Sequence, residues 1–209
     1  MMRLPVTLLL ACAGAALAAG PAQAVNAATQ TYVFVCENQT TNTVRATGAE
    51  AWVFRPGGTL RLPSVPGEAG SYSDGSFMLL IEGQTARLGA VGADPVLCRN
   101  DRRSAIWEKA KLDGADFRAV GNEPGWHLEI REQSRIVLVA DYGASRVELP
   151  LPEPITDTAT RTTRWDAGEL VLEVTGRPCR DSMSGELFET EVRVTWQGRT
   201  LRGCGRALH

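Results

Sequence analysis

Short runs in which apolar and polar residues alternate fill most of the chain beyond about residue 30. A period of two predicts β-strands that are buried on one face. In one run, Trp126, Leu128 and Ile130 share a face, and the charged or polar residues between them share the other. The predicted strands cover residues 32–36, 51–55, 59–62, 76–81, 85–88, 126–131, 136–140, 146–149, 169–174, 191–196 and 200–202.

Turn-forming residues separate these runs. The segments are Pro56-Gly57-Gly58, Asp74-Gly75 and Glu82-Gly83, and Asp-Gly between two alternating runs is a strong hairpin signal. The proline-rich stretch 150–154 predicts an extended connection or a broken edge strand. Short strands at close spacing, without alternating helices, favour antiparallel barrels or sandwiches over a doubly wound sheet.

One segment, residues 100–112, breaks the strand pattern. Asn100 or Asp101 can cap a helix, and Gly114 can end it. The residues expected on its amphipathic surface are Ala105, Ile106, Lys109, Ala110 and Leu112. We therefore expect an all-β protein with two small antiparallel β-barrel or sandwich domains, residues 28–100 and 114–209, joined by a short helical linker at 101–113.

The first 24 residues resemble a cleaved signal peptide. Arg3 precedes an apolar stretch, residues 4–19, and Ala22-Gln23-Ala24 supplies a small-x-small cleavage site. The apolar stretch is shorter than the roughly 20 residues that a transmembrane helix needs. In the alternative, Leu9-Leu10-Ala11-Cys12 acts as a lipoprotein signal, and Cys12 carries a lipid tether. Both interpretations predict export, and we expect a periplasmic location.

Four cysteines follow this segment: Cys36, Cys98, Cys179 and Cys204. An even number of cysteines behind a signal peptide predicts disulfides in an oxidising compartment. Four cysteines allow three connectivities, and the sequential one (Cys36–Cys98 and Cys179–Cys204) is the one that matches two independent domains. The chain has no C-x-x-C spacing and only two histidines, so we expect no metal site.

Charge and motifs disfavour several function classes. The net charge is −2 with both signs interspersed, which argues against a nucleic-acid partner. No glycine-rich phosphate loop is evident, so no cofactor is expected.

One set of residues suggests catalysis: Glu123 near Trp126, with Asp181 and Ser184. Two carboxylates near an aromatic ring are typical of glycoside hydrolysis. In the structural alternative, Pro124 sets a turn, Trp126 packs in a core, and Asp181 and Ser184 cap a turn beside a disulfide. His127 has no nucleophile context. We favour the structural interpretation and predict that the protein is not an enzyme.

Several features of the first half occur in a familiar order. An opening strand ends at Cys36, and two further strands contain Trp52 and Leu60. Next comes the segment Ala69-Gly-Ser-Tyr72-Ser-Asp74-Gly75. An apolar strand, the Glu82-Gly83 turn and Cys98 follow it. In this order, residues 32–98 resemble the membrane-bound inhibitors of C-type lysozyme, a family of small periplasmic β-barrels. The resemblance implies a partner that is a C-type lysozyme or a related cell-wall hydrolase.

The resemblance also implies a binding loop. In the family, the segment before the tyrosine enters the lysozyme cleft, where its serine and a lysine from the later turn meet two catalytic carboxylates. The residues implied here are Ala69, Gly70, Ser71, Tyr72, Ser73, Asp74 and Glu82. Ala69 (or Glu68, with another gap) stands at the serine position, Ser71 is a nearby substitute, and Glu82 stands at the lysine position. A carboxylate facing carboxylates is repulsive, so Glu82 departs from the family pattern.

The second half carries Phe117-Arg-Ala-x-Gly121-Asn-Glu123-Pro124-x-Trp126, Cys179-x-Asp181-x-Met183-Ser184 and Gly203-Cys204-Gly205. These segments resemble an uncharacterised family of bacterial envelope proteins, which implies location and fold but no chemistry. The leading hypothesis is a non-catalytic inhibitor that blocks a lysozyme cleft with its 69–75 loop. The alternative is an envelope-maintenance binding module that recognises a cell-wall fragment, a lipid or another envelope protein through the second domain. A third hypothesis is a hydrolase that uses Glu123 and Asp181.

Overall fold

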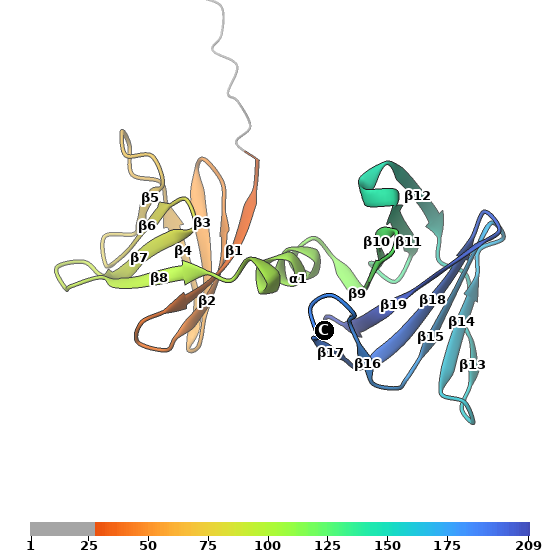
Figure 1. Ribbon diagram of the computed structural model, residues 1–209. Coiled ribbons are helices and arrows are strands. Elements are labelled where there is room, and N and C mark those ends of the chain that lie inside the picture. The colour runs from red at the N-terminus through yellow and green to blue at the C-terminus, as the bar shows by residue number, and fades with distance from the viewer. Residues whose placement is uncertain (1–27) are drawn as a thin grey trace, which may run out of the picture.

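The computed structural model describes residues 28–209, which form two large antiparallel sheets with one α-helix between them and a separate two-stranded hairpin (Figure 1). The expected signal peptide and Cys12 lie outside the described residues. The all-β class with a single connecting helix is confirmed.

The first sheet forms a nearly closed barrel. Its strands are β1 (Gln30–Cys36), β2 (Thr41–Ala46), β3 (Glu50–Arg55), β4 (Gly58–Pro63), β5 (Ser71–Ser73), β6 (Phe77–Glu82), β7 (Thr85–Ala90) and β8 (Val96–Asn100). They are ordered β4-β3-β2-β1-β8-β7-β6-β5, and a bridge between Ser64 and Tyr72 links the two ends. The inward residues of each strand form the core, and Phe34, Val53 and Leu79 are completely buried.

Local signals placed the turns of this barrel correctly. Asp74 Oδ1 accepts hydrogen bonds from the backbone N–H groups of Ser76 (2.8 Å) and Phe77 (2.7 Å), and Gly75 adopts a positive φ of 87°. This is the expected Asp-Gly hairpin between β5 and β6. The sequence prediction missed β2, β5 and β8, because β2 is mostly polar, β5 has three residues, and β8 is short and follows a proline.

Helix α1 (Arg102–Leu112) begins and ends where its capping residues predicted. Asp101 accepts hydrogen bonds from the backbone N–H groups of Arg103 and Ser104, and Gly114 follows the C-terminus with φ 88°. The predicted buried surface was wrong at Ile106, which is 53% exposed, whereas Trp107 is buried. The reason lies in the tertiary structure. Trp107 packs against Phe188, which belongs to a small two-stranded hairpin beside the second large sheet, and the ring centroids are 5.3 Å apart. The helix is therefore packed against the second sheet as well as linking the two sheets.

The second sheet curls into a half-barrel. Its strands are β9 (Ala115–Asn122), β10 (Gly125–Arg131), β11 (Arg135–Ala140), β12 (Ser145–Pro150), β13 (Ile155–Asp157), β14 (Thr162–Asp166), β15 (Leu170–Thr175), β18 (Thr190–Trp196) and β19 (Arg199–Ala207). Their order is β12-β11-β10-β9-β19-β18-β15-β14-β13. Residues 151–154 form a connection without strand structure between the two edges, as the prolines predicted. The one-turn helix η1 (Asp141–Gly143) joins β11 to β12.

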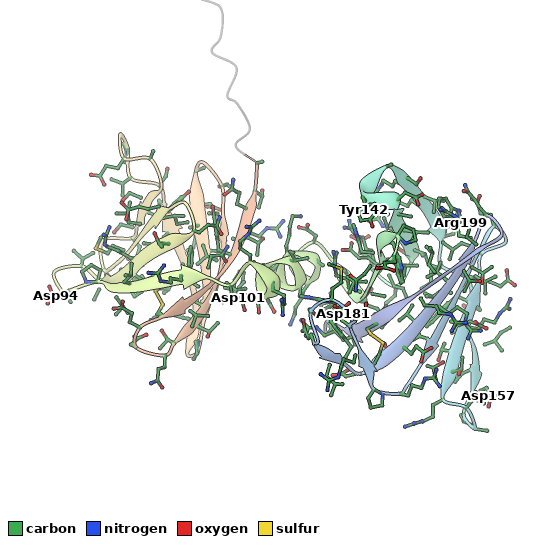
Figure 2. All side chains as sticks on the ribbon, viewed as in Figure 1. Asp94, Asp101, Tyr142, Asp157, Asp181 and Arg199 are labelled. Carbon is green, nitrogen blue, oxygen red and sulfur yellow. A yellow bond between two sulfur atoms is a disulfide. The ribbon has the colours of Figure 1, made fainter. Side chains whose placement is uncertain are left out.

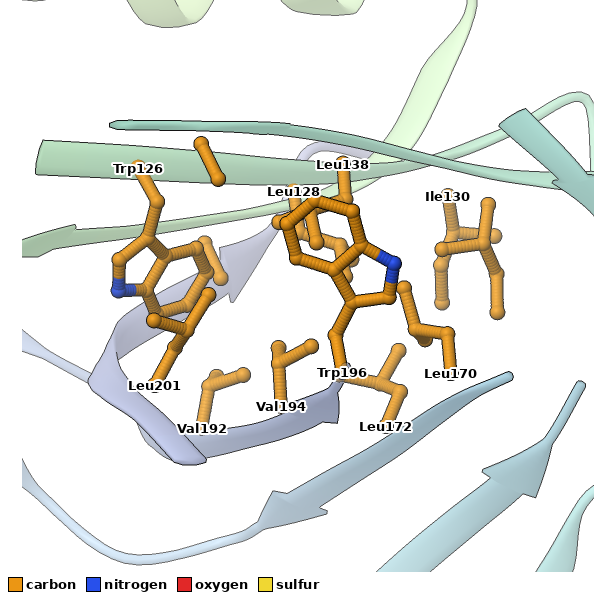
Figure 3. Close-up of a cluster of buried hydrophobic side chains, with 13 residues drawn as sticks. Trp126, Leu128, Ile130, Leu138, Leu170, Leu172, Val192, Val194, Trp196 and Leu201 are labelled. Atoms are coloured by element: carbon orange, nitrogen blue, oxygen red, sulfur yellow. The ribbon is translucent and has the colours of Figure 1, made fainter. Parts of the chain in front are cut away.

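The core of the half-barrel lies on its concave face. Figure 3 shows Trp126 and Leu128 of β10 facing Leu201, Val192 and Trp196 from the opposite side of the curled sheet. The predicted alternation in β10 is confirmed, because Trp126, Leu128 and Ile130 all belong to this core.

Both disulfides have the sequential pairing. Cys36–Cys98 joins neighbouring residues of β1 and β8, and Cys179–Cys204 joins β19 to a small hairpin made of β16 (Cys179–Arg180) and β17 (Leu187–Phe188). The second disulfide holds this hairpin beside helix α1, where Cys204, Phe188 and Trp107 share one buried cluster.

Candidate functional site

A cavity of about 480 Å³ opens beside helix α1. Its walls come from α1, η1, the β16–β17 hairpin, and the C-terminal part of β9 with the N-terminal part of β10. Tyr142 and Asp181, both labelled in Figure 2, line it from different elements. We call this cavity the helix-side groove; its volume is typical of small-molecule sites.

Trp107 forms the inner apolar wall of the groove. Its ring contacts Phe188, and the guanidinium carbons of Arg206 and Arg118 lie 4.3 Å and 5.7 Å from its centroid. Guanidinium groups at these distances are attracted to the face of an indole ring. Trp107 is 5% exposed, so this wall is held rigidly.

Tyr142 forms the outer wall and is 82% exposed. Both Asp141 and Tyr142 adopt positive φ values, 54° and 56°, which non-glycine residues rarely do. The turn is held by Asp141, which accepts two hydrogen bonds from Arg199 (3.0 and 3.1 Å) and one from Ser145 Oγ (3.0 Å).

The Tyr142 ring lies directly against Gly125, where an added Cβ atom would fall 2.8 Å from the ring. The glycine therefore allows the Cδ1–Cε1 edge of the ring to approach the β10 backbone closely at the groove mouth. A strained turn that is fixed by several contacts and presents an exposed aromatic ring is a feature that is concentrated at binding sites.

The floor of the groove carries charged residues from the outer faces of β9 and β10. Arg118 and His127 line the groove. Glu129 is 2% exposed and lies behind this lining, where it pairs with Arg118 and accepts a 2.7 Å hydrogen bond from Arg131 Nε. Burial, together with the charge of Arg118, lowers the pKa of His127 to about 4. The imidazole is therefore neutral at pH 7 and can both donate and accept a hydrogen bond.

Asp181 and Asn122 form the polar end of the groove. Asp181 Oδ1 accepts hydrogen bonds from the backbone N–H groups of Ser184 (2.6 Å) and Met183 (3.1 Å), and Oδ2 accepts one from Asn122 (2.8 Å). Burial alone would raise the pKa of Asp181, but these hydrogen bonds outweigh it and the pKa is lowered. Asp181 thus caps the turn beside the Cys179–Cys204 disulfide, as the structural interpretation predicted.

The structure brings together three of the four residues of the predicted second site. Asp181, Ser184 and the edge of Trp126 line the helix-side groove, whereas Glu123 is exposed and does not line it. Trp126 itself is 5% exposed and belongs to the core. The carboxylate pair that a hydrolase would use is therefore not assembled in this groove.

Sequence reasoning missed Arg103, Trp107, Arg118 and Tyr142. An aromatic residue between Asp141 and Gly143, in a turn between two apolar runs, was the one local signal that could have identified Tyr142. No group of metal-ligating side chains occurs within residues 28–209.

The 69–75 loop of the first sheet has a different character. Ser71 and Tyr72 are buried (9% and 8% exposed), and Tyr72 Oη donates a 2.8 Å hydrogen bond to the Thr47 carbonyl oxygen. Ser73 Oγ donates to the Phe77 carbonyl oxygen at 2.9 Å. Gly70 has φ 76°, and an added Cβ atom would fall 2.5 Å from the Ile81 carbonyl oxygen. The residues from Gly70 to Ser73 thus build the barrel wall, and the Ser71 hydroxyl is not presented at the surface.

The exposed side chains around this loop are acidic or small: Glu68, Ala69, Asp74 and Glu82. Backbone hydrogen bonds from Phe77 and Ser76 lower the pKa of Asp74. Glu82 forms a salt bridge with Arg87, the nearest cation to the position of the family lysine.

The chain matches no protein-family model, no curated protein and no solved structure. Within residues 28–209, no helix has the length and apolar character needed to cross a membrane.

Proposed function

We propose that this protein is a non-catalytic, exported binding protein of the bacterial cell envelope, and that the helix-side groove holds a sugar fragment of the cell wall. The observation that carries this proposal is the Tyr142 ring, which is 82% exposed and fixed against Gly125 at the groove mouth.

The composition of the groove favours a sugar over a lipid. A pyranose has an apolar C–H face that packs on a flat aromatic ring and hydroxyl groups around its edge. In the groove, the Tyr142 ring can pack on the apolar face, and Asn122, His127 and Ser184 can bind the hydroxyl groups. A lipid chain would cover the polar atoms of these side chains without offering them any hydrogen bond, which is unfavourable.

The acidic groups of the groove support binding without catalysis. Asp181 is held by three hydrogen bonds, and Glu129 is engaged by two arginines. The pKa of Asp181 is lowered, whereas a general acid at neutral pH needs a raised pKa. The two disulfides favour an oxidising compartment such as the periplasm.

The test is a titration of the disulfide-bonded protein with a soluble digest of bacterial cell wall, followed by calorimetry and by NMR of backbone amides. We expect shifts that are concentrated at α1, η1 and the β16–β17 hairpin. Tyr142→Ala should weaken binding about tenfold, the equivalent of about 1.4 kcal/mol. Trp52→Ala, which removes a partly exposed aromatic ring from the first sheet, is the matched control and should bind as wild type does. Absence of binding, or shifts only in the first sheet, would exclude the groove.

Lysozyme inhibition is the second candidate function. It is favoured by the segment between β4 and β5, which projects from the barrel and exposes Pro66, Gly67, Glu68 and Ala69 (Figure 1). Inhibition would then be steric and would use this projecting turn, since Ser71 and Tyr72 are buried in the barrel wall.

This candidate is tested by titrating the protein into a C-type lysozyme assay. If the turn enters the cleft, Ala69→Trp should abolish inhibition without changing the barrel fold. Tyr72→Ala is unsuitable for this test, because it removes a core residue. Full activity of lysozyme in the presence of a folded, excess partner would rule the candidate out.

A further inference from the structure

The acidic side chains that touch the helix-side groove all have partners within the protein. Glu186 forms a salt bridge with Arg206 at 3.4 Å, and the buried Glu129, which lies behind the lining, is paired with Arg118 and Arg131. Asp181 is satisfied by the turn that it caps. None of these carboxylates is left to neutralise a further cation in the groove.

Arg103 is such a further cation. It lines the groove from the first turn of α1, is exposed, and forms no salt bridge within residues 28–209. The first turn of a helix disfavours positive charge, because the backbone N–H groups there already carry partial positive charge. Arg103 is therefore placed where it contributes little to folding and much to the charge of the groove.

The floor of the groove is also positive. Arg118 lines this floor, and Arg131 and Arg146 lie outside the lining but close enough to His127 to disfavour its protonation. Glu129 pairs with Arg118 and Arg131, and Glu148 pairs with Arg146, so three arginines are opposed by two carboxylates. The Nε atom of Arg118 is buried without a hydrogen-bond partner, so one donor in the floor remains unsatisfied. Because this atom is buried, an anion in the groove would not reach it and would be attracted chiefly by the exposed guanidinium of Arg103.

We propose that the helix-side groove selects acidic sugars, with Tyr142 packing on the sugar ring and Arg103 pairing with a carboxylate that the ring carries. This inference rests on the proposed function and names the class of sugar that the groove prefers. Guanidinium groups bind carboxylates through two parallel hydrogen bonds, which gives both strength and orientation. Neutral His127 adds a hydrogen bond without adding a charge.

The experiment compares sugars that differ in the carboxylate. N-acetylmuramic acid is paired with N-acetylglucosamine, and glucuronic acid is paired with glucose. Calorimetry on the disulfide-bonded protein should give each acidic sugar an affinity at least about tenfold higher than that of its neutral counterpart. This advantage should shrink as salt is raised, because screening weakens exposed charge pairs. Preference for the muramic acid over the glucuronic acid would identify the cell wall as the source of the ligand.

Two neighbouring arginines provide a matched pair of variants. Arg103→Ala should lower the affinity for acidic sugars about tenfold, to that of their neutral counterparts, and leave the affinity for neutral sugars unchanged. Arg102 is exposed on the same helical turn but does not line the groove, so Arg102→Ala should behave as wild type.

The possible failures are distinguishable. Equal affinities for the acidic and neutral sugars, or an Arg103→Ala variant that weakens both equally, would overturn the acid preference while leaving the groove as a sugar site. Absence of binding by all four sugars and by the cell-wall digest would overturn both proposals.

Discussion

Gly121 offers a sharp test of how the second sheet is packed. Its backbone has an ordinary extended conformation, so an alanine there would be tolerated on conformational grounds alone. However, a Cβ atom at this position would lie 2.1 Å from Nε1 of Trp126 and 2.6 Å from the carbonyl oxygen of Arg202. Since non-bonded heavy atoms pack at about 3.5 Å, the indole must move by about 1.4 Å and strand β19 by about 0.9 Å to relieve both contacts.

The expected cost of Gly121→Ala follows from this geometry. Overpacking a filled core costs about 1–3 kcal/mol, and expelling a buried tryptophan costs about 3–5 kcal/mol. The strand constraint at Arg202 leaves little room for relaxation, so we expect about 3 kcal/mol. If residues 28–209 unfold as one unit, that corresponds to a fall in Tm of roughly 6–12 °C, and if the second half unfolds alone, to roughly 12–24 °C.

Urea unfolding followed by tryptophan fluorescence measures this effect, since four of the five tryptophans lie in the second sheet or pack against it. Gly176→Ala is the matched control: its added Cβ atom would meet its nearest neighbour at 3.7 Å, an ordinary contact, and its φ is not positive. We expect a change below about 1 kcal/mol there.

Part of the penalty at Gly121 should disappear in a Trp126→Leu background, because the indole is then absent. An unchanged free energy of unfolding for Gly121→Ala would refute the packing of Trp126 over this glycine. A penalty that is the same in both backgrounds would assign the whole effect to the clash with β19.

Three further predictions concern stability. The pKa of His127 is about 4 in the folded protein and about 6.5 when unfolded, so the unfolded state takes up a proton first as the pH falls. The contribution of neutral His127 is complete above about pH 6.5 and is lost on acidification towards pH 4; after discounting for partial exposure, we expect about 2 kcal/mol. His127→Gln should flatten this part of the pH profile of unfolding, and parallel profiles would contradict the burial of the imidazole. Glu129→Gln leaves Arg118 buried beside a neutral amide and should cost about 3 kcal/mol in urea unfolding, whereas a stability equal to wild type would show that the pair is solvated. Replacing both Cys179 and Cys204 by alanine opens a loop with a sequence separation of 25 and should cost about 3.5 kcal/mol; a much smaller loss would mean that the β16–β17 hairpin is held by Trp107 and Phe188 alone.

The glycine-rich motifs of the second half now have a packing explanation. Gly121 and Gly203 make room for the Trp126 indole, and Gly205 makes room for the Phe117 ring, where an added Cβ atom would fall 2.6 Å away. The glycines among the features that carried the resemblance to an envelope protein family are therefore requirements of the core. They do not by themselves indicate a binding or catalytic role.

The sequence by itself determined most of the secondary structure. Strand alternation, the Asp-Gly hairpin and the Asp101 cap depend on contacts between residues close in the chain, so local patterns were sufficient. The four cysteines that follow the expected signal peptide predicted disulfides, because an even number of cysteines in an exported chain is typical of disulfide pairing. Strands such as β2 and β14 contain many polar residues, so they show no clear alternation of apolar and polar positions. They were missed because the neighbouring strands stabilise them, and the sequence pattern does not show these neighbours.

Only the tertiary structure decided which side chains are available for function. Helix α1 presents Ile106 to solvent and buries Trp107, because the β16–β17 hairpin lies on one side of it. Tyr72 is in the barrel core, and its hydroxyl reaches Thr47, 25 residues earlier in the chain. The groove combines Arg103, Tyr142 and Asp181, which local pattern could not relate because their proximity depends on how a sheet curls and where a helix docks.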